Sequence, residues 1–483
     1  MSARSYENRS KKGARTRAAD NMRIIILGAG RVGESVAETL ASEANDITVV
    51  DPDPERLHVL EDRVELRGVA GNGIQPSVLR GAGAEDCDLF IACTSADETN
   101  LVACKIAHDV FGIPNTIARL RSPEFVAGDK LLAKEGFAVD HVICPEASVT
   151  RYIHLLIEYP EALQVLQFSQ GKAHLVAVRV ARDSLLANRS IAEFRAMNPD
   201  LPVRIVALYR GDRDQAFDRD TRVFAGDEIF VLVPREGVRA TLHAIGNPDR
   251  PVRRVMIAGG GRVGLRLARS LIGKCEVKLI ERDRARCEYL AAELPPEMLV
   301  LQGDGVDEEL LMDENVADMD LFIAITSDDE DNIMAAMLAK RLGARRVMAL
   351  INRRAYADMM QGSTIDIAIS PSNAVIGELL MHVRRGAVAA VHSLRRGTAE
   401  ALEGVAHGDA RTSRLVGRRV EQITLPAGAR IAGIVRGAGN DARVVNPTHD
   451  AVIETDDHVI IFLPHKRMVR EVEKLFQVRA TFF

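Results

Sequence analysis

Short apolar runs alternate with amphipathic stretches along most of the chain. The runs, for example Ile24–Gly28 and Leu89–Cys93, are bounded within a few residues by Gly, Pro or charge, which is typical of buried strands. After the first run, Val32, Val36 and Leu40 recur every four residues, so we expect a helix with one face packed on a sheet. Strands that alternate with helices in this way predict βαβ units and a parallel sheet.

The whole pattern occurs twice. The second copy keeps the apolar helix spacing at Val263, Leu267 and Leu271. An ordered series of matches is much harder to obtain by chance than one glycine motif, so we infer an internal duplication. The matched segments are RIIILGAGRVGE (23–34) with RVMIAGGGRVGL (254–265), ITVVD (47–51) with VKLIE (277–281), GNG (71–73) with GDG (303–305), and DLFIACTSADETN (88–100) with DLFIAITSDDEDN (320–332).

A segment of different character follows each copy. Strands separated by Gly, Asp and Pro turns are predicted at LVAVRV (175–180), RIVALYR (204–210) and DEIFVLVP (227–234), and the last two are repeated at RIAGIVRG (430–437) and DHVIIFLP (457–464). The predicted fold class is α/β, a tandem duplication of a Rossmann-like parallel-sheet domain, each followed by a small strand-rich domain. We place the Rossmann-like domains at 22–140 and 253–370, the small domains at 141–245 and 371–478, and a linker at 246–253.

Composition and charge exclude several classes of protein. The 483 residues are 47% hydrophobic and 27% charged, which indicates a soluble protein with several packed domains. No apolar run approaches the roughly 18–20 residues that cross a bilayer. The net charge is only −5, so we expect no nucleic-acid partner. The six cysteines lack C-x-x-C spacing, which predicts reduced thiols of a cytosolic protein, without disulfides or a metal site.

The first 21 residues differ from the rest. They are basic and lack the apolar core of a secretory signal, so we predict a disordered basic tail over 1–21. Because Met22 directly precedes a predicted strand, this tail is either an addition ahead of the true start or an arm that touches phospholipid headgroups.

Each copy carries a glycine motif between its first strand and its first helix. In the first copy the motif is Gly28-x-Gly30-x-x-Gly33, and Asp51 ends the next strand. This context favours a dinucleotide, because glycines allow close approach to phosphate, the helix N-terminus attracts anions, and the acid can bind ribose hydroxyls. The alternative is a degenerate site in which the glycines serve only packing. The second copy keeps the pattern at Gly259, Gly261, Gly264 and Glu281.

The carboxylate after the second strand favours NAD over NADP, because it would repel a 2′-phosphate. Three arginines beside Glu281, namely Arg282, Arg284 and Arg286, weaken that inference for the second copy. The motif does not separate NAD from ATP or ADP, since all three carry an adenosine ribose diol and a diphosphate.

Other polar residues follow the later strands of each copy. Thr94 and Ser95, with Thr326 in the second copy, either reach phosphate or ribose or cap the next helix beside Asp97 and Asp329. Asn72 and Asp304 lie in Gly-flanked turns and either contact the adenosine or stabilise the turn. Arg119 and Arg121 either complete a phosphate clamp or are solvated, and Leu350 and Asn352 replace them in the second copy.

Nothing in the sequence indicates catalysis. An oxidoreductase needs an acid or base near the nicotinamide, yet the histidines of the small domains do not repeat between copies. Hydrolase, metalloprotease and Walker motifs are absent from the sequence. We therefore expect a binding protein and no enzyme, with a soluble NAD-dependent oxidoreductase as the alternative.

The duplicated motif order resembles one family specifically. GAGRVG, an acidic strand end, G-[ND]-G, TS-x-[DE]-x-x-N and a strand-rich domain, twice in one chain, closely resemble the TrkA family. These are regulatory subunits of bacterial Trk potassium uptake systems, built from RCK (regulator of potassium conductance) modules with a small α+β C-terminal domain. The resemblance implies a peripheral protein on the cytoplasmic face of the inner (plasma) membrane, a homo-oligomer (a dimer or tetramer ring) beneath a TrkH- or TrkG-type membrane subunit.

The resemblance also implies that NAD, NADH, ATP or ADP gates potassium flux, with an RCK regulator of another ion transporter as the alternative. It suggests that helices at 146–158 and 372–383 pair the modules, with intradomain packing as the alternative. It places the nucleotide contacts on Gly28, Ala29, Gly30, Arg31, Val32, Gly33, Asp51, Asn72, Gly73, Thr94, Ser95 and Arg119, and on Gly259, Gly261, Arg262, Val263, Gly264, Glu281, Asp304, Gly305 and Thr326.

Overall fold

The computed structural model describes residues 21–42, 45–126, 129–211, 213–245, 250–360, 364–383, 387–394 and 398–478. The basic tail predicted for 1–21 lies outside the described residues except for Asn21, and so does the 246–249 part of the predicted linker. The chain divides into two compact units between Val142 and Ile143.

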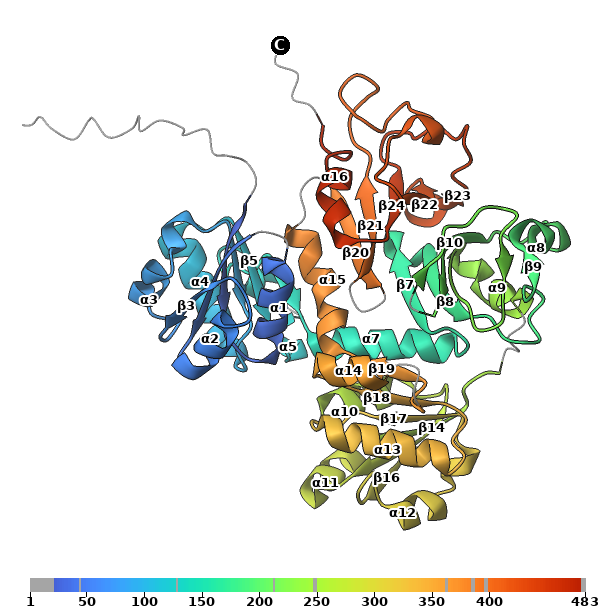
Figure 1. Cartoon of the computed structure of the whole chain (residues 1–483). Coiled ribbons are helices and arrows are strands. Elements are labelled where there is room, and N and C mark those ends of the chain that lie inside the picture. The colour runs from blue at the N-terminus through green and yellow to red at the C-terminus, as the bar shows by residue number, and fades with distance from the viewer. Residues whose placement is uncertain are drawn as a thin grey trace, which may run out of the picture. The chain divides into compact units, whose positions relative to one another are not determined.

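The first unit is a parallel α/β domain, coloured blue in Figure 1. Its sheet order is β3-β2-β1-β4-β5-β6, and Ile24 of β1 pairs with Ile47 on one side and Leu89 on the other. The elements are β1 (Arg23–Leu27), α1 (Arg31–Ala41), β2 (Asp46–Asp51), α2 (Pro54–Glu61), β3 (Arg67–Ala70), α3 (Pro76–Gly81), β4 (Leu89–Ala92), α4 (Asp97–Phe111), β5 (Asn115–Arg119), α5 (Pro123–Val126), α6 (Asp129–Leu132) and β6 (His141–Ile143).

The order of the strands fixes where a ligand can lie. Because the chain continues from β1 to β2 on one side and returns to β4 on the other, the strand order reverses at the carboxyl ends of β1 and β4, which is where ligands bind in open α/β sheets. We call this sheet edge, with the glycine loop beside it, the crevice. The central strands β1 and β4 are apolar on both faces, as a parallel sheet covered by helices requires, and Phe90 and Ile91 are completely buried.

The second unit begins with α7 and an antiparallel sheet of order β11-β10-β13-β8-β7. Pro145 occupies the first turn of α7, where its missing N–H costs nothing. The elements are α7 (Pro145–Glu158), β7 (Gln164–Phe168), β8 (Ala173–Arg179), β9 (Arg189–Ser190), α8 (Ile191–Met197), β10 (Arg204–Arg210), β11 (Arg213–Asp214), β12 (Arg222–Val223), β13 (Glu228–Pro234) and α9 (Val238–Ala244).

A second parallel sheet, β16-β15-β14-β17-β18-β19, has the same strand order as the first. Its elements are β14 (Arg254–Ala258), α10 (Arg262–Ser270), β15 (Glu276–Glu281), α11 (Arg284–Glu293), β16 (Leu299–Gln302), α12 (Glu308–Asp313), β17 (Leu321–Ala324), α13 (Asp329–Arg341), β18 (Val347–Leu350), α14 (Arg354–Met360) and β19 (Ile367–Ile369).

The chain ends with a second antiparallel sheet of order β20-β21-β24-β22-β23. The predicted fold class, a tandem duplication of a Rossmann-like domain followed by a small α+β domain, is confirmed. The last elements are α15 (Pro371–Val383), β20 (Val388–Leu394), β21 (Ala399–Val405), β22 (Arg430–Arg436), β23 (Arg443–Val445), β24 (His458–Leu463) and α16 (Val469–Glu473).

Within the second unit the two antiparallel sheets share one apolar core. Phe168 and Phe230 from the first sheet and Ile460 and Phe462 from the second belong to the same buried cluster. The helices α7 and α15 also contact each other, and Ser148 Oγ donates to Glu378 Oε1 at 2.8 Å. Their contact joins the two copies, as expected for helices that pair modules, and α7 additionally packs on α10.

Candidate functional site

The loop between β1 and α1 holds the first glycine motif at the crevice. Gly28 has a φ of +105°, and a Cβ there would lie 3.2 Å from the Thr94 nitrogen. A Cβ at Gly33 would lie 1.9 Å from the Gly28 carbonyl oxygen, so α1 meets the loop backbone to backbone. The left-handed backbone at Gly28 and the close packing at Gly33 therefore require glycine.

Gly30 is different. It is the N-cap of α1 with a φ of −75°, and a Cβ there would meet no atom within 4 Å. Neither the backbone conformation nor packing requires glycine at this position. The alternative of a degenerate site, in which the glycines serve only packing, therefore does not explain Gly30. Gly30 directly precedes the first turn of α1, where N–H groups and the helix dipole attract anions.

The second copy repeats this geometry. Gly259 has a φ of +116°, and a Cβ on Gly264 would lie 2.0 Å from the Gly259 carbonyl oxygen. Gly261, the N-cap of α10, again has open space around its Cβ position. In each loop the fold requires glycine at the first and third positions of the motif. The second position, Gly30 or Gly261, has room for a side chain.

The acid that ends the second strand ties each loop in place. In the first copy the buried Asp51 carboxylate accepts the Ala29 N–H at 2.7 Å and the Asp53 N–H at 2.9 Å. In the second, Glu281 accepts the Gly260 and Asp283 N–H groups, each at 2.9 Å. The acid that we assigned to a ribose therefore also fixes the loop beside it.

A buried asparagine that sequence reasoning gave no role lies below each crevice. Asn100 Oδ1 accepts the Thr94 N–H at 2.9 Å and the Thr94 hydroxyl at 2.7 Å, and its Nδ2 donates to the Arg119 carbonyl at 2.8 Å. Asn332 makes the same contacts to Thr326 and Leu350. The signal was present in the sequence, since both residues end the repeated TS-x-[DE]-x-x-N segment.

The Thr94 and Asp97 side chains are both engaged within the fold. The Thr94 hydroxyl donates to Asn100, and the N-cap of α4 is Ala96, without a side-chain cap. Asp97 accepts the backbone N–H groups of Arg121 and Ser122 at 2.9 and 2.8 Å, and so positions the loop after β5. In the second copy Asp329 does the same for Asn352 and Arg353.

The turns after the third strands have the same plan in both copies. Asn72 Oδ1 accepts the Ile74 N–H at 3.2 Å, and Asp304 Oδ1 accepts the Val306 N–H at 3.1 Å, so both stabilise their turns. A Cβ on Gly73 would lie 2.1 Å from Leu27, and a Cβ on Gly305 would lie 2.8 Å from Ala258. Each turn therefore packs directly on the strand that leads to the glycine loop.

An ion-pair bridge spans the second crevice. Arg282, which follows β15, lies 2.7 Å from Asp304 and 3.3 Å from Asp331 on α13. Since β14 lies between β15 and β17 in the sheet, the Arg282–Asp331 pair links residues that follow the strands on either side of the glycine loop. The corresponding residues of the first copy are Pro52, Asn72 and Thr99, which cannot form such a bridge.

The remaining predicted residues lie around these loops. Arg31, Ser95 and Arg262 are exposed, while Val32 and Val263 are half-buried. Arg119 ends β5 and is half-buried, whereas Leu350 is buried at the equivalent place. Burial raises the pKa of the neighbouring Cys93 thiol to about 12 although the Arg119 charge lowers it, so this thiol is neutral near pH 7.

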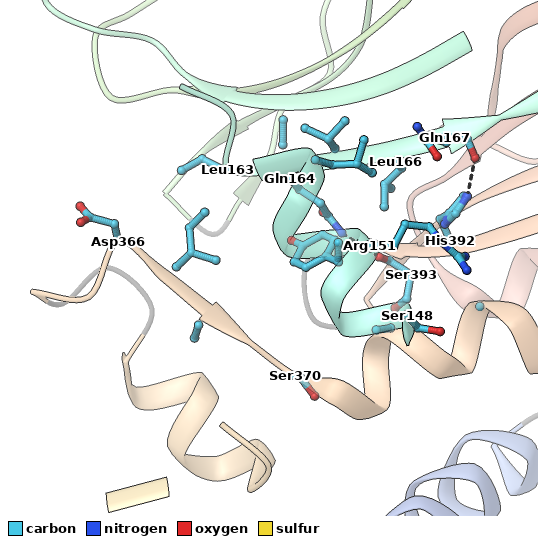
Figure 2. A pocket seen from close by; sticks show the side chains of 18 of the residues that line it. Ser148, Arg151, Leu163, Gln164, Leu166, Gln167, Asp366, Ser370, His392 and Ser393 are labelled. Carbon is cyan, nitrogen blue, oxygen red and sulfur yellow. Dashed lines mark hydrogen bonds between the residues drawn. The ribbon is translucent and has the colours of Figure 1, made fainter. Parts of the chain in front are cut away.

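A separate cavity of about 830 Å³ lies in the second unit between α7, α15 and the edge strands β7 and β20. Figure 2 shows Gln164, Gln167, His392 and Ser393 along one wall and Ser148 with Arg151 on another, with His392 Nε2 hydrogen-bonded to the Gln167 carbonyl at 2.8 Å. Two of its arginines form ion pairs, Arg151 with Glu378 at 3.2 Å and Arg345 with Asp320 at 3.0 Å.

Within the part of the chain that the structure describes, every helix is too short or too polar to span a bilayer. No group of three or more His, Cys, Asp or Glu side chains among those residues is arranged to hold a metal ion.

The fold and the loops define a class of protein, a tandem pair of Rossmann-type modules with glycine-loop crevices, each completed by an antiparallel domain. The TrkA-N domain model matches residues 24–145 and 255–371, and the TrkA-C domain model matches 175–246 and 410–477. The chain belongs to the TrkA family.

Relatives match along nearly the whole chain. A protein from Halomonas elongata named Trk system potassium uptake protein TrkA is 47% identical over 462 residues, which cover 96% of this chain and 100% of the relative. A protein of the same name from Vibrio alginolyticus is 47% identical over 458 residues, covering 94% and 99%. The solved GsuK channel bound to NAD has the same fold, with a TM-score of 0.58 and 17% identity over 95% of this chain and 79% of that one.

Proposed function

We propose that this chain is a nucleotide-binding regulatory subunit of a potassium transporter. The observation that carries the proposal is the open position at Gly30 and Gly261, at the N-terminus of a helix and at the edge where the strand order reverses. Membership of the TrkA family supports the link to potassium uptake, because relatives of nearly equal length bear the name of that system.

The residues of the first crevice fit an adenine nucleotide such as NAD or NADH, with ATP or ADP possible at the same place. Backbone N–H groups at Gly30, Arg31 and Val32 would hold phosphate. Asp51 already accepts two backbone N–H groups, and the remaining lone pairs of its carboxylate would accept hydrogen bonds from ribose hydroxyls. Asn72, Thr94 and Arg119 would contact the adenine base and the second phosphate of the nucleotide. A bound nucleotide supplies charge and shape, and the chain carries no reaction on it.

The second crevice would bind more weakly. Its ligand must reach past the bridge between Arg282 and the carboxylates of Asp304 and Asp331. Leu350 also supplies no charge where the first copy has Arg119. We propose the predicted residues Gly259, Gly261, Arg262, Val263, Gly264, Glu281, Asp304, Gly305 and Thr326 as its contacts.

Regulation requires a nucleotide to bind two conformations of the assembly with different affinity, because equal affinity shifts no equilibrium. We propose that the chain forms a homo-oligomeric ring, a dimer or a tetramer, on the cytoplasmic face of the plasma membrane. The ring would contact a TrkH- or TrkG-type subunit that conducts potassium, and the domain boundaries predicted from the sequence would delimit its modules. The NAD bound to the GsuK channel, which shares this fold, is in keeping with such a role.

The proposal is tested by potassium uptake in a bacterial host that lacks its own TrkA. The wild type and Gly30→Ala should restore uptake, because a methyl group fits at residue 30. Gly30→Asp should not, since it places a negative charge where phosphate would lie. Equal rescue by Gly30→Asp would contradict nucleotide control through this crevice. Turnover of NADH by the purified protein with a small substrate would instead favour an oxidoreductase.

A further inference from the structure

A second pocket lies where the two antiparallel sheets of the second unit meet, away from both glycine loops. Its volume is about 350 Å³, and it lies where β10 and β22 contact each other. Its charged and aromatic lining consists of Arg195, Arg204, Phe217, Asp218, Arg219, Arg430 and His449.

Two of these arginines are related by the duplication and cross between the domains. Arg204 is the first residue of β10, and Arg430 is the first residue of β22. Arg204 reaches the Asn446 side-chain oxygen at 3.3 Å and the Pro447 carbonyl at 3.4 Å. Arg430 reaches the Val206 carbonyl at 3.5 Å and lies 4.0 Å from the Phe217 ring centroid. All these partners are neutral.

The positive charge of the pocket is therefore poorly balanced. No carboxylate among the described residues lies within 4 Å of the guanidinium groups of Arg195, Arg204 or Arg430. Burial and then the charges of Arg195 and Arg430 lower the pKa of Arg204 to about 10, and burial also lowers the pKa of Arg430. Arginine stays protonated near pH 7, so two like charges line one pocket at half-buried positions.

One carboxylate, Asp218, lines the pocket but forms no ion pair with Arg195, Arg204 or Arg430 among the described residues. Hydrogen bonds from the Thr221 hydroxyl at 2.8 Å and the Asp220 N–H at 3.0 Å lower its pKa, so it stays ionised and offsets one of the pocket's positive charges. Asp214 is exposed and acts on Arg430 only through its field. In the larger cavity, by contrast, Arg345 pairs with Asp320 at 3.0 Å.

We propose that this pocket binds a compact phosphate-type anion between the two antiparallel domains, either inorganic phosphate or the phosphoryl group of a small ester. Guanidinium groups match phosphate oxygens with paired N–H donors, and here they come from both domains. The bound anion would hold the two sheets together, so its concentration would act on the contact between the modules. This site is distinct from the nucleotide crevices and does not depend on them.

The test is calorimetric titration of the full chain with inorganic phosphate or methyl phosphate, in saturating NADH and at constant ionic strength in chloride. We expect one phosphate per chain. Binding should weaken by roughly tenfold or more in Arg204→Gln and in Arg430→Gln, because each removes a charge-assisted contact. Arg182→Gln, which removes an exposed arginine of the same domain, is the matched control and should bind as the wild type does.

Binding of both probes would identify the phosphoryl group of an ester as a ligand, and binding of inorganic phosphate alone would identify the free ion. A wild type that does not bind either probe, or a double variant that binds them unchanged, would overturn the proposal. If a glutamine variant does not fold, Arg430→Lys keeps the charge but loses the paired donors. It should bind phosphate measurably less tightly than the wild type, and equal affinity would count against the site.

Discussion

Asn100 is the residue on which the geometry of the first crevice depends most. Its one amide group holds the end of β4 at Thr94 and the end of β5 at Arg119, and it is completely buried. A buried amide with all its contacts satisfied stabilises a fold, and removing it leaves backbone groups without partners. Because Asn332 repeats these contacts, the duplication has kept both the ligand loop and the support beneath it.

We predict that Asn100→Ala lowers the free energy of unfolding of its domain by about 2 kcal/mol, since it leaves the Thr94 N–H and the Arg119 carbonyl unpaired. In calorimetry of the full chain the transition of that domain should move down by roughly 5–10 °C. Asn115→Ala, at an exposed asparagine that begins β5, is the control and should change little. An unchanged transition in Asn100→Ala would show that the contacts carry no net stability.

Two glycines of the first loop, Gly33 and Gly30, should respond differently to alanine. Gly33→Ala forces a Cβ to 1.9 Å from the Gly28 carbonyl oxygen, so α1 must move and the domain should lose about 3 kcal/mol or more. Gly30→Ala meets open space and should stay within about 0.5 kcal/mol of the wild type. Denaturant unfolding of the two variants measures the difference, and similar losses would contradict the assigned roles.

At the residue scale, the glycines and the two acids could be predicted because their spacing is local in the sequence. The bridge of Arg282 with Asp304 and Asp331 could not, since its members follow three different strands and meet only in the folded sheet. The hydrogen bond from the Ala29 N–H to Asp51 could not be predicted either, because the motif identifies the acid but not the direction in which its oxygens point.

At the scale of elements, the β7–β8 turn connects the two antiparallel domains. Ser169 and Gln170 have φ values of +46° and +56°, which non-glycine residues rarely adopt. The buried Glu403 of β21 accepts the Ser169 N–H at 3.0 Å and the Ser169 hydroxyl at 2.8 Å. His458 Nδ1 lies 2.5 Å from the same carboxylate, so one acid holds both the turn and a histidine.

This contact should make stability depend on pH. The hydrogen bond to Glu403, aided by the charges of Glu403, Asp457 and Asp456, raises the pKa of His458, while burial lowers it less. Because folding raises this pKa, the protonated imidazole stabilises the folded state. The stabilisation is fully present below the unfolded pKa of about 6.5 and is lost as pH rises through the folded pKa. Burial raises the pKa of Glu403, but the bonds from His458 and Ser169 outweigh it, so that carboxylate stays ionised as pH falls.

We therefore predict that His458→Gln lowers the melting temperature most near pH 6, with a difference that shrinks toward pH 9. His407→Gln is the control, because His407 pairs with Asp456 on the exposed surface of the same domain. A pH-independent difference between His458→Gln and the wild type would contradict the role of the imidazolium.

The elements themselves were largely readable from the sequence. Strand β10 covers Arg204–Arg210 as predicted, and both parallel sheets follow from the repeated alternation of strands and helices. The packing of α7 on α10 was not readable, because apolar periodicity shows that a helix has a buried face without naming its partner. For the same reason the shared core of the two antiparallel sheets appears only in three dimensions.

At the scale of the whole molecule, the duplication yields two crevices of the same plan and unequal charge. We compare the six residues that begin with the acid at the end of the second strand. In the first copy Asp51–Arg56 contains three acids and one arginine, whereas in the second copy Glu281–Arg286 contains two acids and three arginines. We predict two classes of NADH site on the full chain. Gly30→Asp should remove the tighter class, and Gly261→Asp should remove the weaker one.

Equilibrium titration separates these classes. A single class of site in the wild type, or loss of the weaker class in Gly30→Asp, would contradict the ranking. The ranking of the two affinities rests on two features of the second crevice. These are the bridge at Arg282 and the buried, uncharged Leu350 in place of Arg119.

The central claim is that the open position of each glycine loop is where nucleotide phosphate binds. The most direct test is the affinity of the purified full chain for NADH and ATP, measured at one ionic strength for Gly30→Ala/Gly261→Ala and for Gly30→Asp/Gly261→Asp. A Cβ at either position meets no atom within 4 Å, so neither pair introduces a clash at the Cβ. The alanine pair should bind nearly as the wild type does, and the aspartate pair should bind at least tenfold more weakly. Equal affinity of the two double variants would contradict the account.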